Sequence, residues 1–277
     1  KALGAMPQTT LGYEKLVNWG FAAEGEEEFV RMVLDGQPEP PRYFAEMKRV
    51  NRDGPAARGD LTPPPQLPDA GLAEALSAAG AVVVDARAAA DFAAGHVPGT
   101  LGIPLNKSFA TWAGSLLPYD RDLYLIVDES VPDAAADAAK TLALIGLDRV
   151  RGYFGGGAVD AWRRDAGRAL ETVAQLSTGE LRTRLARGDR LAVIDVRGRS
   201  EWDAGHLPSA VHVPLGELAE RAAEVPRDRP VVLHCQGGTR SVIAAGVLQR
   251  LGVSNVVNLS GGFGEWRAEG GEVDNGG

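Results

Sequence analysis

The sequence predicts an α/β fold of two tandem domains, each a mostly parallel sheet flanked by helices, preceded by a short, mainly helical segment. Two observations lead to this prediction. The first is an internal repeat, because Val82–Gly99 aligns with Ala192–Ser209 at a constant offset of 110 residues. The second is the alternation of short β-branched runs with amphipathic segments in each copy, which is typical of parallel sheets covered by helices on both faces.

Composition excludes several classes of function. The length of 277 residues fits two domains, and the net charge of −8 argues against a nucleic acid or an anionic membrane as partner. No run approaches the ~18 apolar residues of a membrane span, and we expect no signal peptide before the first domain. A single cysteine excludes an internal disulfide and fits a reducing compartment, so we expect a cytoplasmic protein.

The N-terminal segment, residues 1–54, matches neither copy of the repeat. It begins at Lys1 without an initiator Met, which indicates that the natural protein starts further upstream. Within it, Glu24–Leu34 combines an acidic first turn with an apolar stripe, and this pattern predicts a helix. Residues 55–70 follow, with Pro63 to Pro65 and Pro68 close together, and predict a semi-rigid linker.

The two copies occupy residues 71–168 and 169–277. Asp85 and Arg87 of the first copy match Asp195 and Arg197 of the second. Short apolar runs in the second copy predict buried parallel strands, and a segment with apolar residues at helical spacing predicts a helix. The expected strands are Leu191–Asp195, Val231–His234 and Val256–Val257, and the expected helix is Ser241–Leu251.

A glycine-containing loop directly after the strand Val231–His234 carries the chemistry. Successive amides in such a loop converge on an anion, and the positive end of the following helix points to the same place. A cysteine at that position is a nucleophile held as a thiolate, which favours covalent catalysis without a metal. We expect Cys235 and Arg240 to be catalytic, with Arg240 either contacting substrate or bracing the loop. The predicted binding loop is Gln236, Gly237, Gly238, Thr239 and Arg240.

The loop and its surroundings resemble the rhodanese family of sulfurtransferases. The resemblance rests on the Asp-x-Arg strand end, the Glu-Trp-x-x-Gly-His-Leu-Pro segment, the Cys-x-x-Gly-x-Arg loop and the Gly-Gly…Trp ending. It covers about 171–268, and about 72–166 as a degenerate copy, so both domains are expected to be rhodanese-like. It implies that Cys235 carries a persulfide inside the amide loop. Supporting roles for the scaffold are implied for Asp195, Arg197 and His206.

Two departures between the copies refine this expectation. In the first copy the cysteine position falls at Val127-Asp128, followed by Glu129, so that copy should be catalytically silent. In the second copy four residues separate Cys235 from Arg240, one fewer than in related phosphatases and arsenate reductases. The shorter loop favours sulfur over a tetrahedral oxyanion. His234, at the end of an apolar run, is expected to be a packed core residue.

Residues 1–54 resemble the end of a metallo-β-lactamase-fold domain, of the branch fused to rhodanese modules and related to persulfide dioxygenases. The resemblance rests on Lys1–Glu14 and Pro40–Asn51. It implies an upstream domain that holds iron or zinc, while the segment itself has no His or Cys and gives no metal site. We therefore expect no cofactor in this chain, and a C-terminal fragment of a longer hydrolase or dioxygenase of sulfur metabolism.

Taken together, these features predict a sulfurtransferase that moves sulfane sulfur to a thiol or to cyanide. The donor would be of the thiosulfate or glutathione persulfide type, and glutathione is a candidate acceptor. One alternative is a persulfide-sensing or docking module that does not turn over. Another, less favoured by loop length, is an arsenate reductase or phosphatase. The silent copy is expected to serve as a spacer or as the face of a homodimer.

Overall fold

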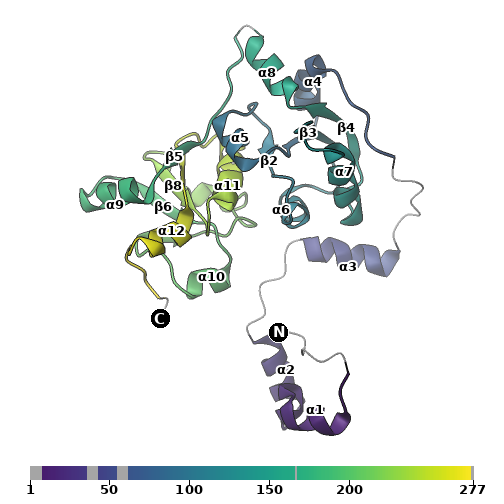
Figure 1. Cartoon of the computed structure of the whole chain (residues 1–277), viewed down its shortest axis with the longest axis vertical. Helices are drawn as coiled ribbons and strands as arrows, with labels where there is room; N and C mark the ends of the chain where they lie inside the picture. Colours follow the sequence, from purple (N-terminus) through teal and green to yellow (C-terminus); the bar gives the residue numbers. More distant parts are fainter. Residues whose placement is uncertain (1–7, 36–42, 55–61, 166, 276–277) are drawn as a thin grey trace. The chain divides into compact units, whose positions relative to one another are not determined.

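The computed structural model describes residues 8–35, 43–54, 62–165 and 167–275, and it divides into two compact units, residues 1–39 and 40–277 (Figure 1). The first unit is helical, and Trp19 stacks on Phe29 with ring centroids 6.2 Å apart. None of its three helices has a buried residue. These helices are α1 (Leu11–Val17), η1 (Trp19–Ala22) and α2 (Glu26–Leu34).

The second unit begins with the exposed helix α3 (Tyr43–Asp53), and the first α/β domain follows it. This domain has a four-stranded parallel sheet in the order β2-β1-β3-β4. Its strands are β1 (Val82–Asp85), β2 (Leu101–Gly102), β3 (Leu123–Val127) and β4 (Val150–Gly155). Its helices are η2 (Asp69–Gly71), α4 (Leu72–Ser77), α5 (Ala89–Ala94), α6 (Phe109–Leu116), α7 (Ala134–Leu144) and α8 (Gly157–Arg164).

The second α/β domain has a five-stranded parallel sheet in the order β5-β9-β8-β6-β7. Its strands are β5 (Ala174–Leu176), β6 (Ala192–Asp195), β7 (Ala210–His212), β8 (Val231–His234) and β9 (Val256–Leu259). Its helices are α9 (Thr178–Ala186), α10 (Arg199–Asp203), η3 (Ala222–Glu224), α11 (Thr239–Arg250) and α12 (Gly262–Ala268). The predicted fold class, two α/β domains with parallel sheets flanked by helices, is therefore confirmed.

The two sheets repeat one another strand by strand. In the first, Asp85 pairs with Ile126 across β1 and β3, and in the second, Asp195 pairs with His234 across β6 and β8. The linker takes the place that β5 has in the second sheet, because Gln66 forms a parallel bridge with Tyr153 of β4. This register makes Val127, the residue after Ile126, the structural counterpart of Cys235.

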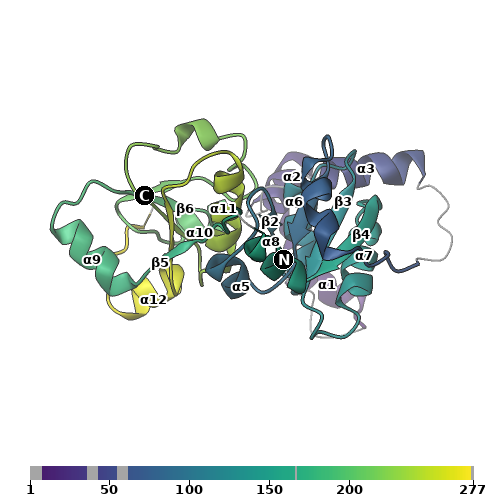
Figure 2. The same cartoon turned by 90° about the horizontal axis from the view of Figure 1, so that it is seen from above.

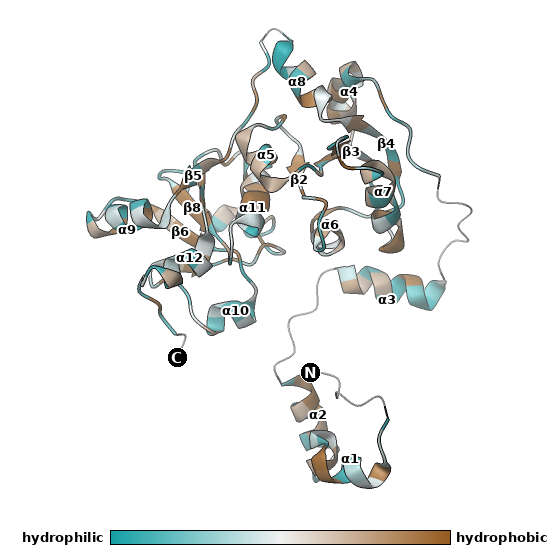
Figure 3. Cartoon of the chain, viewed as in Figure 1, coloured by the Kyte–Doolittle hydropathy of each residue, from teal (hydrophilic) through white to brown (hydrophobic). Residues whose placement is uncertain are grey.

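A shared hydrophobic core joins the two domains. Phe92 of α5 is buried, and a methyl group placed on Gly246 of α11 would lie 3.0 Å from its ring. Both views show α5 beside α11 (Figures 1 and 2), and one buried cluster includes Phe92, Ile243 and Leu125. Apolar residues lie along β6, β8 and α11 (Figure 3), as expected for elements enclosed on both sides. The helix that follows the cysteine loop is therefore held by both domains.

Several predicted element boundaries differ from the observed ones: β6 begins one residue later than expected, β9 ends two residues later and α11 ends one residue earlier. The helix expected from Ser241 begins at Thr239, because Gly238 adopts φ 99° and acts as its N-terminal cap. The N-terminal helix begins at Glu26, two residues after its expected start. Of the predicted linker, residues 55–61 lie outside the described residues, as do residues 1–7 of the N-terminal segment. No helix among the described residues is long and apolar enough to cross a membrane.

Candidate active site

The candidate nucleophile, Cys235, lies between the end of β8 and the start of α11. In a parallel sheet the carboxyl ends of the strands share one edge, where ligands of α/β proteins bind. The side chain is 2 % exposed, and its chain neighbours Gln236 and Gly237 are exposed. The thiol therefore lies at the base of a loop that faces solvent.

A backbone amide, a hydroxyl group and the Arg240 guanidinium lie near the sulfur atom. The backbone amide of Gly238 donates to Sγ of Cys235 over 3.1 Å, and Oγ of Ser241 lies 3.6 Å from the same atom. The Ser241 hydroxyl also lies 2.9 Å from the carbonyl oxygen of Gly238. Because the first-turn amides of a helix have no partners within it, the start of α11 adds further donors beside the loop. This surrounding favours negative charge on sulfur.

The loop is anchored from the opposite side by the start of α12. The amide of Phe263 donates to the carbonyl oxygen of Cys235 over 2.8 Å, and the amide of Gly264 donates to that of Gln236 over 2.9 Å. Gly262 has φ 59°, and a methyl group placed on it would lie 2.4 Å from the Cys235 carbonyl oxygen. Only glycine permits this close approach, so the Gly-Gly pair of the sequence motif fixes the base of the loop.

Arg240 forms a bidentate ion pair with Glu201 at the other end of the loop. Nη1 and Nη2 lie 2.6 and 2.7 Å from the two carboxylate oxygens. The Arg240 guanidinium holds the pKa of the Glu201 carboxyl below its usual value, and the carboxylate raises the pKa of Arg240. Such a fork fixes the direction of the guanidinium, so Arg240 connects the loop to α10.

Asp195 and Arg197 form a buried pair behind the loop. Nη2 and Nε of Arg197 lie 2.6 and 2.9 Å from Oδ2 of Asp195, and Nη2 also donates to the carbonyl oxygen of Gly205. The guanidinium lies over the ring of Phe263, 4.0 Å from its centroid. The first copy repeats this pairing with Asp85 and Arg87.

His206 stacks on Trp202 with ring centroids 3.5 Å apart, and its Nδ1 lies 3.1 Å from the Trp202 carbonyl oxygen. His96 of the first copy has the same arrangement with Phe92, at 3.8 and 2.9 Å. These histidines and the Asp–Arg pairs occur equally in a copy with a cysteine and in a copy without one. Their arrangement is that of scaffold, so a supporting role for Asp195, Arg197 and His206 remains our interpretation.

His234 lies on the opposite face of β8 from Cys235. Its side chain is fully buried, and neither ring nitrogen has a hydrogen-bond partner among the described residues. Burial lowers the pKa of His234 to about 4, although Asp195 lies 3.7 Å from Nε2 and favours the charged form. The imidazole is neutral at physiological pH, as suits a packed core residue.

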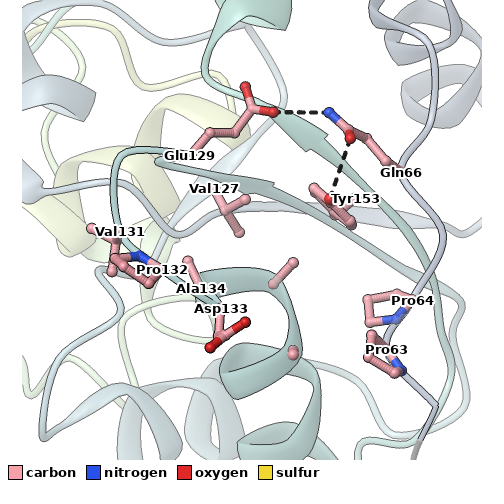
Figure 4. Close-up of a pocket in the computed structure, with 12 residues that line it drawn as sticks. Pro63, Pro64, Gln66, Val127, Glu129, Val131, Pro132, Asp133, Ala134 and Tyr153 are labelled. Atoms are coloured by element: carbon pink, nitrogen blue, oxygen red, sulfur yellow. Dashed lines mark hydrogen bonds between the residues drawn. The ribbon is translucent and has the colours of Figure 1, made fainter.

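The corresponding loop of the first copy has a different chemistry. Val127 stands where Cys235 stands in the second copy, and Glu129 accepts a hydrogen bond from Gln66 over 2.8 Å (Figure 4). These side chains line a cavity of about 400 Å³ together with Tyr153 and Asp133. The loop thus has no cysteine, and it presents carboxylates where the second copy has amides and Arg240.

The sequence pattern does not single out two residues of the site. Glu201 stands there only as part of a motif, and Ser241 only as the start of a helix. For Glu201 a signal existed: in both copies an acid precedes an aromatic residue at this position, Asp91-Phe92 and Glu201-Trp202. For Ser241 the sequence carried no signal, because its contact with sulfur depends on α11 starting two residues earlier than expected.

Comparisons with known proteins identify the family of both α/β domains. The family model of the rhodanese-like domain matches residues 69–164 and 177–269. A sulfurtransferase of Allochromatium vinosum is 34% identical over 98 residues, which are 35% of this chain and 92% of that protein. The Bacillus subtilis protein YqhL is 42% identical over 74 residues, and the chain spans 27% of its own length and 59% of that relative. A metallo-β-lactamase structure from Staphylococcus aureus is 35% identical at a TM-score of 0.44, over 56% of this chain and 41% of that one.

Proposed function

This chain belongs to the rhodanese-like domain family, and from that premise we propose that it is a sulfurtransferase whose second domain carries sulfur on Cys235. The observation that carries the proposal is the pairing of a single buried thiol with the Gly238 amide, 3.1 Å from Sγ, at the start of α11. A thiolate and a persulfide anion both need fixed hydrogen-bond donors, and this arrangement supplies them.

In the first step, the Cys235 thiolate attacks the sulfane sulfur of the donor. A new bond forms between Sγ and that sulfur, while the bond from the sulfane sulfur to the rest of the donor breaks. The leaving group takes the bonding electrons, as sulfite from thiosulfate or as a thiolate from glutathione persulfide. Cys235 is left as a persulfide, and no external oxidant or reductant is needed.

In the second step, an acceptor nucleophile attacks the outer sulfur of the persulfide. The bond between the two sulfurs breaks, and Sγ leaves as the thiolate that began the cycle. Cyanide would become thiocyanate, and a thiol such as glutathione would become its persulfide. The amides of the binding loop, Gln236 to Arg240, stabilise the negative charge on sulfur in both steps.

The other predicted site residues hold this loop in place. Arg240 keeps its guanidinium directed toward Glu201, and its positive charge lies beside the loop. Asp195 and Arg197 fix the end of β6, and His206 fixes the turn after α10. We assign these three a supporting role, and the first copy the role of a catalytically silent domain.

The longer context is also part of the proposal. Residues 1–54 would be the end of a metallo-β-lactamase-like domain, and the whole protein would combine hydrolysis or oxidation of a sulfur compound with sulfur transfer. Iron or zinc would belong to that upstream domain, since residues 1–54 contain no His and no Cys. A cytoplasmic location, and a homodimer formed through the silent copy, complete the proposal.

The test is the mass of the intact protein after brief exposure to thiosulfate or glutathione persulfide, beside Cys235→Ser. We expect the wild type alone to gain one sulfur, and cyanide to remove it with release of thiocyanate. Turnover by Cys235→Ser, or no sulfur gain by the wild type, would contradict the proposal.

The same measurement separates the alternatives. A stable gain of sulfur that neither cyanide nor a thiol removes would indicate a persulfide-sensing or docking module. Release of phosphate from a phosphate ester, or reduction of arsenate, would indicate the oxyanion chemistry of the related enzymes. The short loop between Cys235 and Arg240 argues against that outcome.

A further inference from the structure

The side chain of Ser241, in the first turn of α11, is fully buried beside the reacting sulfur. Its hydroxyl oxygen has two acceptors within reach, Sγ of Cys235 at 3.6 Å and the carbonyl oxygen of Gly238 at 2.9 Å. A serine hydroxyl carries a single hydrogen, so it donates fully to only one of these acceptors at a time. The direction of this hydrogen bond can therefore follow the charge on sulfur.

The carbonyl oxygen of Gly238 does not depend on the hydroxyl for its hydrogen bond. It also accepts a backbone hydrogen bond of α11, from the amide of Val242 over 3.2 Å. A buried carbonyl that keeps one hydrogen bond avoids most of the cost of an unsatisfied polar group. The hydroxyl can therefore turn from this carbonyl to the sulfur and leave the carbonyl bonded.

The stronger of the two acceptors changes with the state of the sulfur. In the free thiolate, Sγ carries a negative charge, and hydrogen bonds to an ionised acceptor are roughly twice as strong as those between neutral groups. In the persulfide, Sγ is a neutral divalent sulfur like that of methionine, which is a weak acceptor. The hydroxyl should thus donate to Sγ in the thiolate and to the Gly238 carbonyl in the persulfide.

The silent copy has an alanine at the equivalent position of its helix. The helices α7 and α11 end alike, because each is followed by a glycine with positive φ, Gly146 at 89° and Gly252 at 76°. Counted back from these glycines by the same number of residues, Ala135 stands where α11 has Ser241. Alanine is also the better helix former, so the shared scaffold does not require a hydroxyl here. The hydroxyl occurs in the copy that has the thiol.

We propose that Ser241 is a catalytic residue whose hydroxyl transfers its hydrogen bond from the Gly238 carbonyl to Sγ of Cys235 as the persulfide is discharged. This inference rests on the proposed sulfur transfer and assigns a residue to its second step. The acceptor nucleophile forms a bond to the outer sulfur, and the bond between the two sulfurs breaks with both electrons passing to Sγ. The hydroxyl keeps its proton throughout and donates a hydrogen bond to the thiolate as the negative charge develops.

This hydrogen bond acts in opposite directions on the two steps. Discharge of the persulfide gains the bond, whereas loading gives it up, because Sγ loses its charge when it attacks the donor. Ser241 therefore favours discharge over loading and shifts the equilibrium between persulfide and thiolate toward the thiolate. A residue that only held the loop in shape would change both steps together and leave this equilibrium unaltered.

The test measures the two half-reactions separately in the full chain, for the wild type and Ser241→Ala. Loading by thiosulfate and discharge by cyanide are followed by intact-protein mass, at a pH above which the rates no longer rise. We expect discharge to slow about tenfold, the difference between a charged and a neutral hydrogen bond, and loading to change less than about twofold. At a fixed ratio of thiosulfate to sulfite, the ratio of persulfide to free protein should rise about tenfold.

Two further variants complete the test. Ser241→Thr keeps the hydroxyl and should hold the persulfide ratio within about twofold of the wild type. Ser77→Ala in α4 is the matched control, since it removes a hydroxyl that donates to the carbonyl oxygen of Glu74 over 3.0 Å, and it should alter neither step. An unchanged persulfide ratio in Ser241→Ala, equal losses in both half-reactions, or the same shift in Ser241→Thr would overturn the inference. If instead the wild type takes up no sulfur, the proposed function itself has failed.

Discussion

The two copies of the repeat share nearly all of their scaffold and differ in one loop. Both have an Asp–Arg pair at the end of equivalent strands, β1 and β6, and a histidine stacked on an aromatic ring. Between strand and helix, however, the first copy has six residues, Asp128–Asp133, and the second has four, Cys235–Gly238. The features that both copies share therefore serve packing. The chemistry depends on the length of the connection between the strand and the helix.

The shorter connection brings the helix start to the sulfur. In the second copy Gly238 caps α11 with φ 99°, and the same residue gives its amide to Sγ. In the first copy α7 begins at Ala134, after Asp133 with φ 56° and without a side-chain cap. A cysteine alone would not make the first loop active, because its helix begins too late and its carboxylates repel an anion.

Among variants that test the difference between the two loops, Gly238→Ala is expected to have the largest effect on turnover. Alanine fits the space, since its methyl group would lie no closer than 3.7 Å to a neighbour, but φ 99° is strained for any side chain. The loop should relax and withdraw its amide from sulfur, which lowers kcat about 100-fold, as is common when one such donor is lost. Ser130→Ala, near the equivalent position in the first copy, is the control and should have no effect on turnover. Undiminished turnover in Gly238→Ala would contradict the assigned role.

The second-largest effect is expected at the ion pair of Arg240 and Glu201, which a double-mutant cycle can test. If Arg240 acts by bracing the loop through Glu201, Arg240→Ala and Glu201→Gln should each lower kcat/KM about tenfold, and the double variant should lose little more. Asp91→Asn, at the position of Glu201 in the silent copy, is the matched control. Contact between Arg240 and the donor would appear as a much larger loss in Arg240→Ala than in Glu201→Gln.

His234→Ile gives the buried histidine position the side chain found at the equivalent position of the first copy, Ile126. The pKa of His234 is lowered to about 4 in the folded state, below its usual value near 6.5. The unfolded chain therefore binds more protons between these values, and stability is complete above pH 6.5 and falls as the pH decreases toward 4. We expect this residue to contribute a slope on the order of 1 kcal/mol per pH unit to the free energy of unfolding. The free energy of unfolding, from denaturant titrations, should differ less between pH 7 and pH 5 in the variant than in the wild type. An equal difference in both proteins would show that this pH dependence does not come from His234.

The smallest effect is expected from Asp128→Ala in the silent loop. The pKa of this carboxyl is lowered by hydrogen bonds from Ser130, so it stabilises its own turn. Sulfur transfer should stay within twofold of the wild type in a thiocyanate assay. A clear loss would show that the first copy takes part in the reaction.

Much of this comparison could be predicted from the sequence. The repeat places Asp85 over Asp195 and Arg87 over Arg197, and buried β-branched strands are strong signals, so the fold class followed directly. The Cys-x-x-Gly-x-Arg loop combined a nucleophile with glycines at a strand–helix junction. Such local features depend only on neighbours in the chain, which a sequence displays.

Contacts between distant segments could not be predicted in the same way. Glu201 meets Arg240 across 39 residues, and their pairing is set by the packing of α10 against the loop. The contact of Phe92 with Gly246 depends on how one domain lies on the other. A cavity of about 520 Å³ between α5 and the cysteine loop arises from that same packing.

The core shared by the two domains also has a consequence for how the chain unfolds. Because Phe92 of one copy fills the space left by Gly246 of the other, one buried cluster spans both copies, beside a smaller cluster within each. Heating should therefore melt residues 62–275 in a single calorimetric transition, with no stable half. A chain cut between the copies would expose the apolar side of α11 and aggregate. Selection can thus retain the degenerate copy for solubility long after its own chemistry has been lost.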